Sequence, residues 1–209
     1  MVSRSRPSRA DYYHALAAAL PARALVVTAL GNASYLWAAV HDAPENFYFE
    51  DAMGLALPMA LGLSVAQPDR EVVVVEGDGG LLMHMGGLVT VGAVAPGNLT
   101  ILLIDNGVHG ASGGQALTSA SIEYADLAGA VGLEKAARVE TEDALRAALA
   151  DAFAAPGPTF LALATAPDTE TVVPPLAFDP AFVKNRFMEA IGAPRYVSTI
   201  FGGGMVGKP

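Results

Sequence analysis

The most constraining feature of this chain is a run of four valines, Val72–Val75, which leads into the glycine-rich segment Gly77-Asp78-Gly79-Gly80. Valine is β-branched and favours an extended backbone. A strand that is apolar at every position buries both of its faces, which is typical of a parallel sheet covered by helices on either side. The run therefore indicates a buried central strand of an α/β protein.

Apolar, β-branched runs of this kind alternate with helical patterns along the chain. We expect strands at residues 24–29, 71–76, 99–105 and 159–165, with weaker candidates at 47–49 and 136–139. We expect helices at 12–20, 34–40, 53–66, 81–95, 122–131, 142–153 and 180–191. This alternation predicts a doubly wound α/β fold, with a mainly parallel sheet and helices on both faces.

Length and composition favour one domain. The chain has 209 residues and is 53% hydrophobic, which is enough for one substantial core. We expect a single domain at residues 1–192 and a glycine-rich C-terminal tail at 193–209, ending in "FGGGMVGKP". For residues 196–201 of this tail, the sequence leaves disorder, docking on a partner and coverage of the site open.

The charge balance argues against nucleic acid as a partner. Lys and Arg number 12 against 21 Asp and Glu, a net charge of −9, and the basic residues are scattered apart from Arg4, Arg6 and Arg9. The absence of cysteine excludes a disulfide framework, a thiolate metal site and a cysteine nucleophile. The N-terminal segment lacks the apolar run of a signal peptide, so we expect a cytoplasmic location.

One long uncharged stretch, Gly79–Ile104, requires a check for membrane insertion. A spanning helix needs about 20 continuous apolar residues. Here Ala95-Pro96-Gly97-Asn98 interrupts the stretch, and a β-branched run follows. We therefore expect two buried elements of a soluble core and no membrane partner.

The glycines on both sides of Asp78 point to a ligand site. Cofactors in parallel α/β sheets bind at the carboxyl ends of the strands, where this segment should lie. Glycine lets the backbone approach a ligand closely, and N–H groups at a helix start suit phosphate oxygens. Phosphate and carboxylate repel each other unless a cation lies between them. We therefore expect Mg²⁺, which commonly joins diphosphate to one or two protein oxygens.

A second strand end supplies further ligands. Asp105-Asn106-Gly107-Val108 closes the strand expected at 99–105, so its carboxyl end should lie beside Asp78. Asn106 offers an amide oxygen, and a turn after it can direct the carbonyl of Val108 at the same ion. Diphosphate and water would then complete the octahedron.

Together these segments resemble the thiamine-diphosphate motif of the pyruvate-decarboxylase-like superfamily, in which Gly-Asp-Gly is followed by Asn at a second strand end. The resemblance covers roughly residues 24–188. It is closest to the thiamine-diphosphate-binding part of phosphonopyruvate and sulfopyruvate decarboxylases. It is carried by "NFYFEDAMGLALPMALGLSVAQPDREVVVVEGDGGLLMHMGGLVTVG", "NLTILLIDNGVHGASGGQ" and "VKNRFMEAI".

This resemblance implies a role for each matching residue. Asp78 and Asn106 would bind Mg²⁺ through their side chains, and Val108 through its carbonyl. Met53 would support the bent form of thiamine diphosphate. The diphosphate would be lined by Gly77, Gly79 and Gly80, and by the loop Gly31-Asn32-Ala33-Ser34.

Structural alternatives stand beside these roles. Asp78 can instead cap the following helix. Met53, close to Leu55 and Leu57, can be an ordinary core residue. Two acidic residues, Glu50-Asp51, replace the Gly-Ser expected before the Met-Gly of the decarboxylases, and they mark either a solvated loop or a different substrate.

The two histidines near the motif differ in their placement. His84 falls within the expected helix 81–95, where we expect a satisfied buried histidine rather than a catalyst. His109 follows Asn106 on a loop that faces the expected site, so it is our candidate catalytic residue. It would donate to an anionic substrate or intermediate, together with Ser112 and the N–H groups of Gly113-Gly114.

Enzymes of the family that this chain resembles also contain a pyrimidine-binding domain, whose glutamate activates the cofactor. We find no second unit of that kind in this sequence, and Glu50 and Glu76 lie too near this domain's own cofactor end to take that role. The resemblance therefore implies an α-like partner subunit that supplies the glutamate, in an α2β2 or higher hetero-oligomer.

By this resemblance, the expected function is thiamine-diphosphate- and Mg²⁺-dependent, non-oxidative decarboxylation of a short 2-oxo acid with an anionic terminal group, phosphonopyruvate or sulfopyruvate, to an aldehyde. Two other classes stay open. One is a different thiamine-diphosphate reaction, carboligation or oxidative decarboxylation, because a cofactor motif does not fix the substrate chemistry. The other is a non-catalytic binding subunit, or a homo-oligomer that holds cofactor without turnover.

Overall fold

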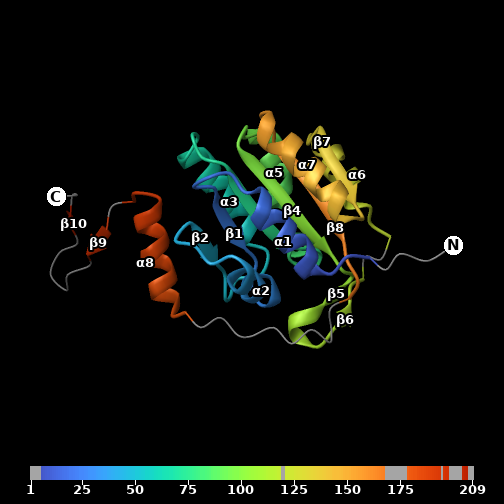
Figure 1. Ribbon diagram of the computed structural model, residues 1–209, viewed down its shortest axis with the longest axis horizontal. Helices are drawn as coiled ribbons and strands as arrows, with labels where there is room; N and C mark the ends of the chain where they lie inside the picture. Colours follow the sequence, from blue (N-terminus) through green and yellow to red (C-terminus); the bar gives the residue numbers. More distant parts are fainter. Residues whose placement is uncertain (1–5, 119–120, 168–177, 194, 198–203, 207–209) are drawn as a thin grey trace.

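The computed structural model describes residues 6–118, 121–167, 178–193, 195–197 and 204–206. Its centre is one six-stranded sheet in which every neighbouring pair of strands is parallel (Figure 1). In spatial order the strands are β2 (Asn46–Tyr48), β1 (Leu25–Thr28), β3 (Val72–Gly77), β4 (Leu99–Asp105), β8 (Thr159–Ala164) and β7 (Lys135–Val139). The four valines thus occupy a central strand, as predicted.

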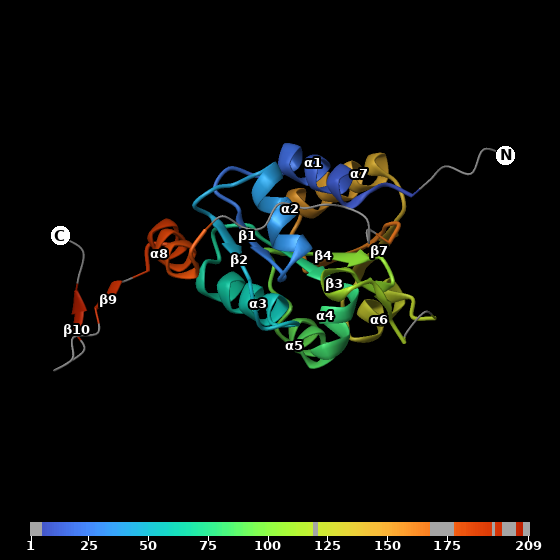
Figure 2. The same cartoon turned by 90° about the horizontal axis from the view of Figure 1, so that it is seen from below.

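Helices cover both faces of this sheet. Figure 2 shows α1 (Arg9–Ala19), α2 (Asn32–Val40) and α7 (Glu142–Ala154) on one face. The other face carries α3 (Ala56–Ala66), α4 (Asp78–Met83), α5 (Met85–Val94) and α6 (Tyr124–Ala130). A further helix, α8 (Pro180–Ala190), packs beside the edge strand β2. The doubly wound α/β fold that the sequence predicts is therefore confirmed.

Alternation along the strands divides the core into two layers. In β3, Val72 and Val74 pack under α3 and α5, while Val73 and Val75 pack under α1 and α2. All four valines are fully buried. Because helices cover both faces of the sheet, the strand carries only apolar side chains until Glu76, next to its carboxyl end.

Local signals explain several helix boundaries. Ser8 and Asp11 form a capping box at the start of α1, in which Ser8 Oγ accepts from the N–H of Asp11 and Asp11 Oδ2 accepts from the N–H of Ser8. Thr141 caps α7. Asp179 caps α8, with Pro180 as the first helical residue.

Most expected elements are present with boundaries that differ by a few residues. Two of the expected helices differ in ways that matter for the site, because one begins late and the other is divided. The helix expected at 53–66 begins at Ala56, so Met53 lies on the preceding loop. The helix expected at 81–95 is two helices, α4 and α5, which meet at His84. Four glycines surround this junction, and their weak helix propensity accounts for the break.

Short elements outside the main sheet complete the description. After β4 the chain forms a small hairpin, β5 (Val108–His109) and β6 (Gln115–Ala116), around the 3₁₀ turn Gly110–Ser112. In the C-terminal tail, β9 (Arg195–Val197) pairs with β10 (Gly204–Val206). Residues 198–201 of the tail segment discussed above lie outside the described residues, and the domain boundary at 192 stays a prediction.

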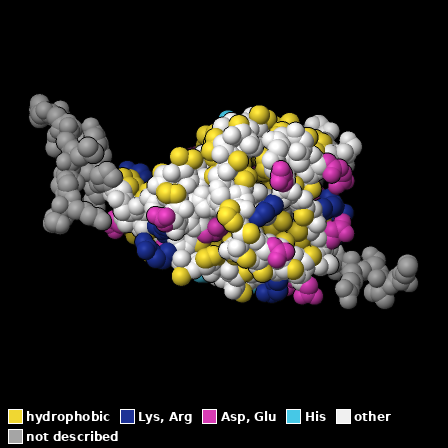
Figure 3. All heavy atoms as spheres, turned by 90° about the horizontal axis from the view of Figure 1, so that it is seen from above, with side chains coloured by type: hydrophobic (Ala, Val, Ile, Leu, Met, Phe, Trp, Pro, Cys, Tyr) yellow, Lys and Arg dark blue, Asp and Glu magenta, His cyan; other side chains and the backbone are white. Residues whose placement is uncertain are grey.

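Two surface properties follow from the structure. Within the described part of the chain, no helix has both the length and the apolar character needed to cross a membrane. Figure 3 shows the face opposite to that of Figure 2, where acidic and basic side chains are interspersed with hydrophobic ones rather than gathered by sign.

The pairing of β3 with β4 sets the position of the site. Their register pairs Val72 with Leu99 and Gly77 with Ile104, so both strands end at the same edge of the sheet. The two motif segments that follow them are thereby brought together, as the sequence predicts.

At the opposite end of β3, Glu71 gives a pH-dependent contribution to stability. Its Oε1 accepts a hydrogen bond from Thr100 Oγ1 (2.8 Å). Burial raises the pKa of Glu71 from 4.5 to about 7, although the Thr100 hydrogen bond opposes the rise. The stability that the protonated side chain contributes is therefore complete below pH 4.5 and lost as the pH rises through about 7.

We predict that Glu71→Gln, which keeps the acceptor oxygen and cannot ionise, raises the free energy of unfolding at pH 8 by about 1–2 kcal/mol, with allowance for partial solvent screening. Near pH 4 the gain should almost vanish. Urea denaturation at both pH values measures it, with the exposed Glu134→Gln as the control. An equal effect of Glu71→Gln at both pH values would contradict this account.

Candidate cofactor site

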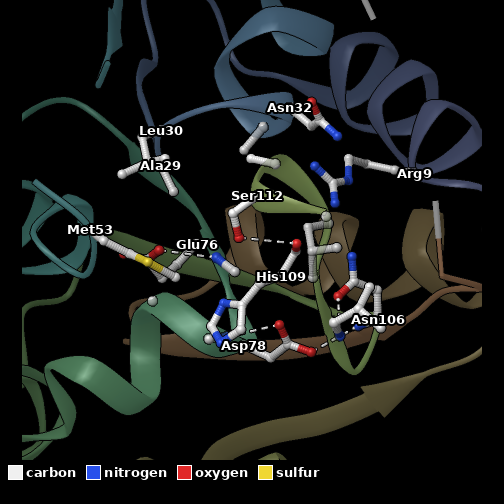
Figure 4. A pocket seen from close by; sticks show the side chains of 18 residues that line it. Arg9, Ala29, Leu30, Asn32, Met53, Glu76, Asp78, Asn106, His109 and Ser112 are labelled. Carbon is white, nitrogen blue, oxygen red and sulfur yellow. Dashed lines mark hydrogen bonds between the residues drawn. The ribbon is translucent and has the colours of Figure 1, made fainter. Parts of the chain in front are cut away.

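A cavity of about 150 Å³ lies at the carboxyl edge of the sheet, between the ends of β1, β3 and β4. Most of the predicted site residues line it (Figure 4). They are Asn32, Met53, Gly77, Asp78, Gly79, Gly80, Asn106, Val108, His109 and Ser112. Segments separated by about 80 residues of chain are therefore combined in one pocket.

Asp78 joins the two strand ends. Its Oδ2 accepts hydrogen bonds from the backbone N–H groups of Asn106 (3.0 Å) and Gly107 (2.7 Å). Its Oδ1 accepts from the N–H of Gly79 (2.8 Å). Asp78 is the first residue of α4, and the cap position is Gly77 with no side-chain cap bond, so the geometry does not support the helix-cap alternative.

The carboxylate of Asp78 is suited to meet a cation. Only 3% of the residue is exposed. Burial raises the pKa of Asp78 above its ordinary value, and the hydrogen bonds from the N–H groups of Gly107 and Gly79 oppose this rise. A carboxylate has about four lone-pair positions, and three N–H groups occupy three of them here. One position is left for a metal ion, whose charge would favour the ionised form.

Asn106 closes the turn after β4. Its Oδ1 accepts a hydrogen bond from the N–H of Val108 (3.0 Å), and Gly107 between them has a φ of 72°, which glycine adopts without strain. This turn places Asn106 and Val108 on the cavity wall near Asp78. The three predicted Mg²⁺ ligands thus lie together, and their binding of the ion stays a prediction.

This ligand set fits Mg²⁺ held jointly with a diphosphate. Across the described residues, no three or more His, Cys, Asp or Glu side chains form a metal cluster. A site that relied on protein ligands alone would need such a cluster. Mg²⁺ instead commonly takes one or two carboxylates and completes its shell with phosphate oxygens and water.

Two glycines keep the cavity floor open. A methyl group at Gly79 would lie 2.6 Å from Cε1 of His109, and one at Gly80 would collide with Oε1 of Glu76. Any larger residue would therefore displace a side chain of the site. The imidazole of His109 packs directly over Gly79, within the cavity and above Asp78 (Figure 4).

Met53 lies at one end of the cavity rather than in the core. The residue is 37% exposed and stands on the loop before α3. The core alternative for Met53 is therefore wrong, because the late start of α3 leaves it outside the packed face of that helix. Its place on the cavity wall agrees with the predicted role beside the cofactor, which remains untested.

Two of the predicted cofactor contacts do not line the cavity, and neither do Gly113 and Gly114, the further predicted donors. Ser34 is buried behind the loop, where its hydroxyl lies 2.8 Å from the carbonyl oxygen of Ala29 and 3.0 Å from that of Phe49. Gly31, with a φ of 71°, allows Ala111 to approach closely. Both therefore shape the loop around Asn32 instead of lining the cavity. Their assignment as cofactor contacts is not supported by the geometry.

The acidic pair and the second histidine also lie outside the cavity lining. Glu50 is half-buried and Asp51 is exposed. His84 is exposed at the junction of α4 and α5, so the expectation of a buried histidine is wrong. The cause is the break in the helix, which turns this position toward solvent.

Glu76 is a cavity residue for which sequence reasoning assigned no role. It is 1% exposed, and its Oε1 accepts from the N–H of Gly77 (3.0 Å), while Oε2 has no hydrogen-bond partner among the described residues. Burial raises the pKa of Glu76 to about 7, although the N–H groups of Gly77, Leu57 and Ala56 favour the carboxylate. Its position directly after the four valines, at the carboxyl end of β3, is the sequence signal that could have indicated a cavity residue.

Arg9 is the second residue that sequence reasoning missed. It comes from the first turn of α1 and lines the same cavity, although it is about 70 residues away from Asp78 in the chain. No motif spacing connects the two. Only the packing of α1 over the sheet brings them together.

The fold and this pocket define a cofactor-binding α/β domain, and comparison with known proteins identifies its family. Residues 29–163 match the family described as thiamine pyrophosphate enzyme, C-terminal TPP binding domain. This match covers more than half of the chain. The protein belongs to this family.

Two of the curated relatives differ in how much of their length this chain covers. Phosphonopyruvate decarboxylase of Streptomyces viridochromogenes is 40% identical over 192 residues, which are 92% of this chain and 48% of the relative. Sulfopyruvate decarboxylase subunit beta of Methanothermobacter thermautotrophicus is 34% identical over 167 residues, which are 80% of this chain and 86% of the relative. The chain thus spans about half the length of the former and most of the latter.

Solved structures agree on the fold. The thiamine diphosphate-dependent 4-hydroxybenzoylformate decarboxylase of Rhodococcus jostii RHA1 superimposes with a TM-score of 0.71 at 22% identity, covering 81% of this chain and 34% of that one. Benzoylformate decarboxylase of Polynucleobacter necessarius gives 0.68 at 20% identity, covering 82% and 36%. At these identities the likeness supports the architecture alone.

Proposed function

We propose that this chain is the thiamine-diphosphate- and Mg²⁺-binding subunit of a 2-oxo acid decarboxylase. The observation that carries the proposal is the junction at Asp78, where one carboxylate binds the ends of both motif segments at the carboxyl edge of a parallel sheet. The similarity to the phosphonopyruvate and sulfopyruvate decarboxylases supports the reaction class.

Each residue then has a defined task. Asp78, Asn106 and the carbonyl of Val108 hold Mg²⁺ against the diphosphate. Gly79 and Gly80 admit the diphosphate close to the backbone. Bound thiamine diphosphate supplies the electron sink that decarboxylation of a 2-oxo acid requires. Met53, at the far end of the cavity, supports the ring portion.

We further propose that the active site is completed by an α-like partner, which supplies the activating glutamate. The cavity on this chain, about 150 Å³, is smaller than the roughly 300–1,000 Å³ of typical small-molecule sites. It therefore has the size of part of a cofactor site. The described relative of nearly equal length is a subunit by name, which agrees with this division.

Exposed apolar side chains beside the cavity support such a partner. Gly54 contacts the junction at His84, since a methyl group added to it would lie 3.1 Å from Cβ of His84. Met53 and Leu55 flank Gly54, and Met83 and Met85 flank His84; all four are exposed. We call these four residues the apolar rim. Apolar patches of this kind are typical of protein interfaces.

The proposed substrate is a short 2-oxo acid with an anionic terminal group, phosphonopyruvate or sulfopyruvate. A protein of net charge −9 needs local donors to bind such an acid. His109 lies on the cavity wall (Figure 4) and is the candidate donor, whereas the hydroxyl of Ser112 beside it donates to Oε1 of Gln115 (3.1 Å) and would have to exchange that hydrogen bond for one to the acid. Donors from the partner would add to them. A cytoplasmic location stays a prediction.

We predict that the wild-type protein, assembled with its partner, binds thiamine diphosphate only when Mg²⁺ is present, and that Asp78→Ala weakens this binding roughly 100-fold or more. Loss of a residue that hydrogen-bonds to a metal ligand already lowers metal affinity about 10- to 100-fold, so loss of a charged ligand should lower it at least as much. Isothermal titration calorimetry measures both. Asp151→Ala, which removes an exposed carboxylate of α7, is the matched control.

Because Asp78→Ala also removes the acceptor of three N–H groups, Asp78→Asn serves as a second variant that retains one acceptor oxygen. Urea denaturation of each variant separates unfolding from loss of a ligand. Thiamine diphosphate binding by the wild type that is independent of Mg²⁺ would overturn the metal assignment.

We predict that the purified chain makes no aldehyde from 2-oxo acids and gains activity when mixed with a pyrimidine-binding α-like subunit. Met83→Lys on the apolar rim should weaken assembly at least about 10-fold, because a buried unpaired charge is costly. Val65→Lys, at an exposed apolar position near the other end of α3, is the control. Analytical ultracentrifugation and aldehyde assays report the outcome, and robust turnover by the chain alone would disprove partner dependence.

We predict that His109→Ala raises KM for the anionic 2-oxo acid about 10-fold, as expected for loss of one charge-assisted hydrogen bond, with a smaller effect on cofactor affinity. His14→Ala, at an exposed position of α1, is the control. A panel of pyruvate, phosphonopyruvate, sulfopyruvate and branched or aromatic 2-oxo acids should be tested on the assembled enzyme. Preference for uncharged bulky acids would refute the substrate class, and carboligation products would indicate the alternative reaction.

A further inference from the structure

The cavity contains a buried cation that the proposed Mg²⁺ site does not require. Arg9 is only 8% exposed and lines the cavity together with Asp78 and Asn106. Among the described residues of the cavity lining, it is the only Lys or Arg. Arginine is seldom buried in proteins.

The fold holds the backbone of Arg9 in place. The capping box of Ser8 and Asp11 fixes the start of α1 on either side of it. One turn later, Tyr12 is fully buried, and its hydroxyl lies 3.2 Å from the carbonyl oxygens of both Val139 and Ala164, near the carboxyl ends of β7 and β8. The first turn of α1 is therefore tied to the same edge of the sheet that carries the cofactor site.

The side chain of Arg9 enters one particular end of the cavity. Figure 4 shows it on the side of Asn32 and Asn106, across the cavity from Met53. Asn106 belongs to the proposed metal site, whereas Met53 marks the ring end of the cofactor. Arg9 thus lies at the diphosphate end.

Binding of a diphosphate at this end of the cavity would be favoured by a second cation beside Mg²⁺. Asp78 is a buried carboxylate of the cavity lining and opposes the entry of an anion, and Glu76, a second buried acidic side chain, lies toward Met53 in Figure 4. Mg²⁺ offsets Asp78 and only part of the charge of a diphosphate. A guanidinium on the cavity wall supplies further positive charge, and its planar set of donors matches the oxygens of a phosphate group.

We infer that Arg9 is an anion-binding residue of this site and contacts the terminal phosphate of the cofactor's diphosphate. This inference rests on the proposed function, because it places the diphosphate beside Asp78. It assigns to α1 a direct part in cofactor binding, in addition to the strand-end loops of the motif. The other source of a phosphate-like anion is the terminal acid of the substrate, and the experiment separates the two.

The test uses the full chain assembled with its α-like partner and two probes, Mg²⁺–thiamine diphosphate and Mg²⁺–pyrophosphate, titrated by calorimetry. Arg9→Met keeps the aliphatic stem and removes the charge, and it should weaken binding of both probes by roughly 10- to 100-fold. Arg9→Lys keeps the charge but loses the paired donors, and it should weaken binding by roughly 3- to 10-fold. Arg6→Met removes an exposed cation from the same segment and should change affinity by less than about 2-fold.

The outcomes separate this inference from the proposed function. Failure of the assembled wild-type protein to bind either probe with Mg²⁺ overturns both. Normal wild-type binding with unchanged affinity in Arg9→Met, or an equal loss in Arg6→Met, overturns the inference alone. A rise in substrate KM at saturating cofactor, without loss of probe affinity, would assign Arg9 to the substrate's acid instead. Circular dichroism checks folding, and Arg9→Lys keeps the test valid if Arg9→Met is unstable.

Discussion

The site depends on one set of hydrogen bonds, those by which the buried carboxylate of Asp78 holds the backbone N–H groups of Asn106 and Gly107. They connect the end of β3 to the end of β4 at the sheet edge. The β3–β4 pairing brings the two strand ends together, and these hydrogen bonds then fix the turn that carries Asn106 and Val108 against the start of α4. A buried carboxylate held in this way is also an unfavourable charge until a cation neutralises it. The hydrogen bonds organise the loops, whereas the burial of the same carboxylate is the cost that a bound cation would offset.

The sheet and this junction could be predicted from the sequence because their signals are local. Four consecutive valines describe a strand with two buried faces, and glycines around Asp78 mark a turn at its end. Parallel pairing then requires that neighbouring strand ends share an edge. The positions of Asp78, Asn106, Val108 and His109 follow from that rule.

Other parts of the site depend on packing between distant segments, so no local signal revealed them. Arg9 reaches the cavity because Tyr12 ties α1 to the far strands. His84 is exposed because the expected helix breaks there into α4 and α5. The break reflects the weak helix propensity of the surrounding glycines, and the sequence pattern alone predicted one continuous helix. Ser34 was placed in the cavity by its motif, whereas its hydroxyl binds backbone carbonyl groups behind the loop.

The most direct test of this account is a crystal structure of the protein with thiamine diphosphate and Mn²⁺ in place of Mg²⁺. Anomalous scattering from Mn²⁺ locates the ion independently of the protein ligands. The account predicts one peak at about 2.0–2.3 Å from a carboxylate oxygen of Asp78, the side-chain oxygen of Asn106 and the carbonyl oxygen of Val108, with diphosphate oxygens completing the shell. Bound cofactor with no ion between Asp78 and the diphosphate would contradict it.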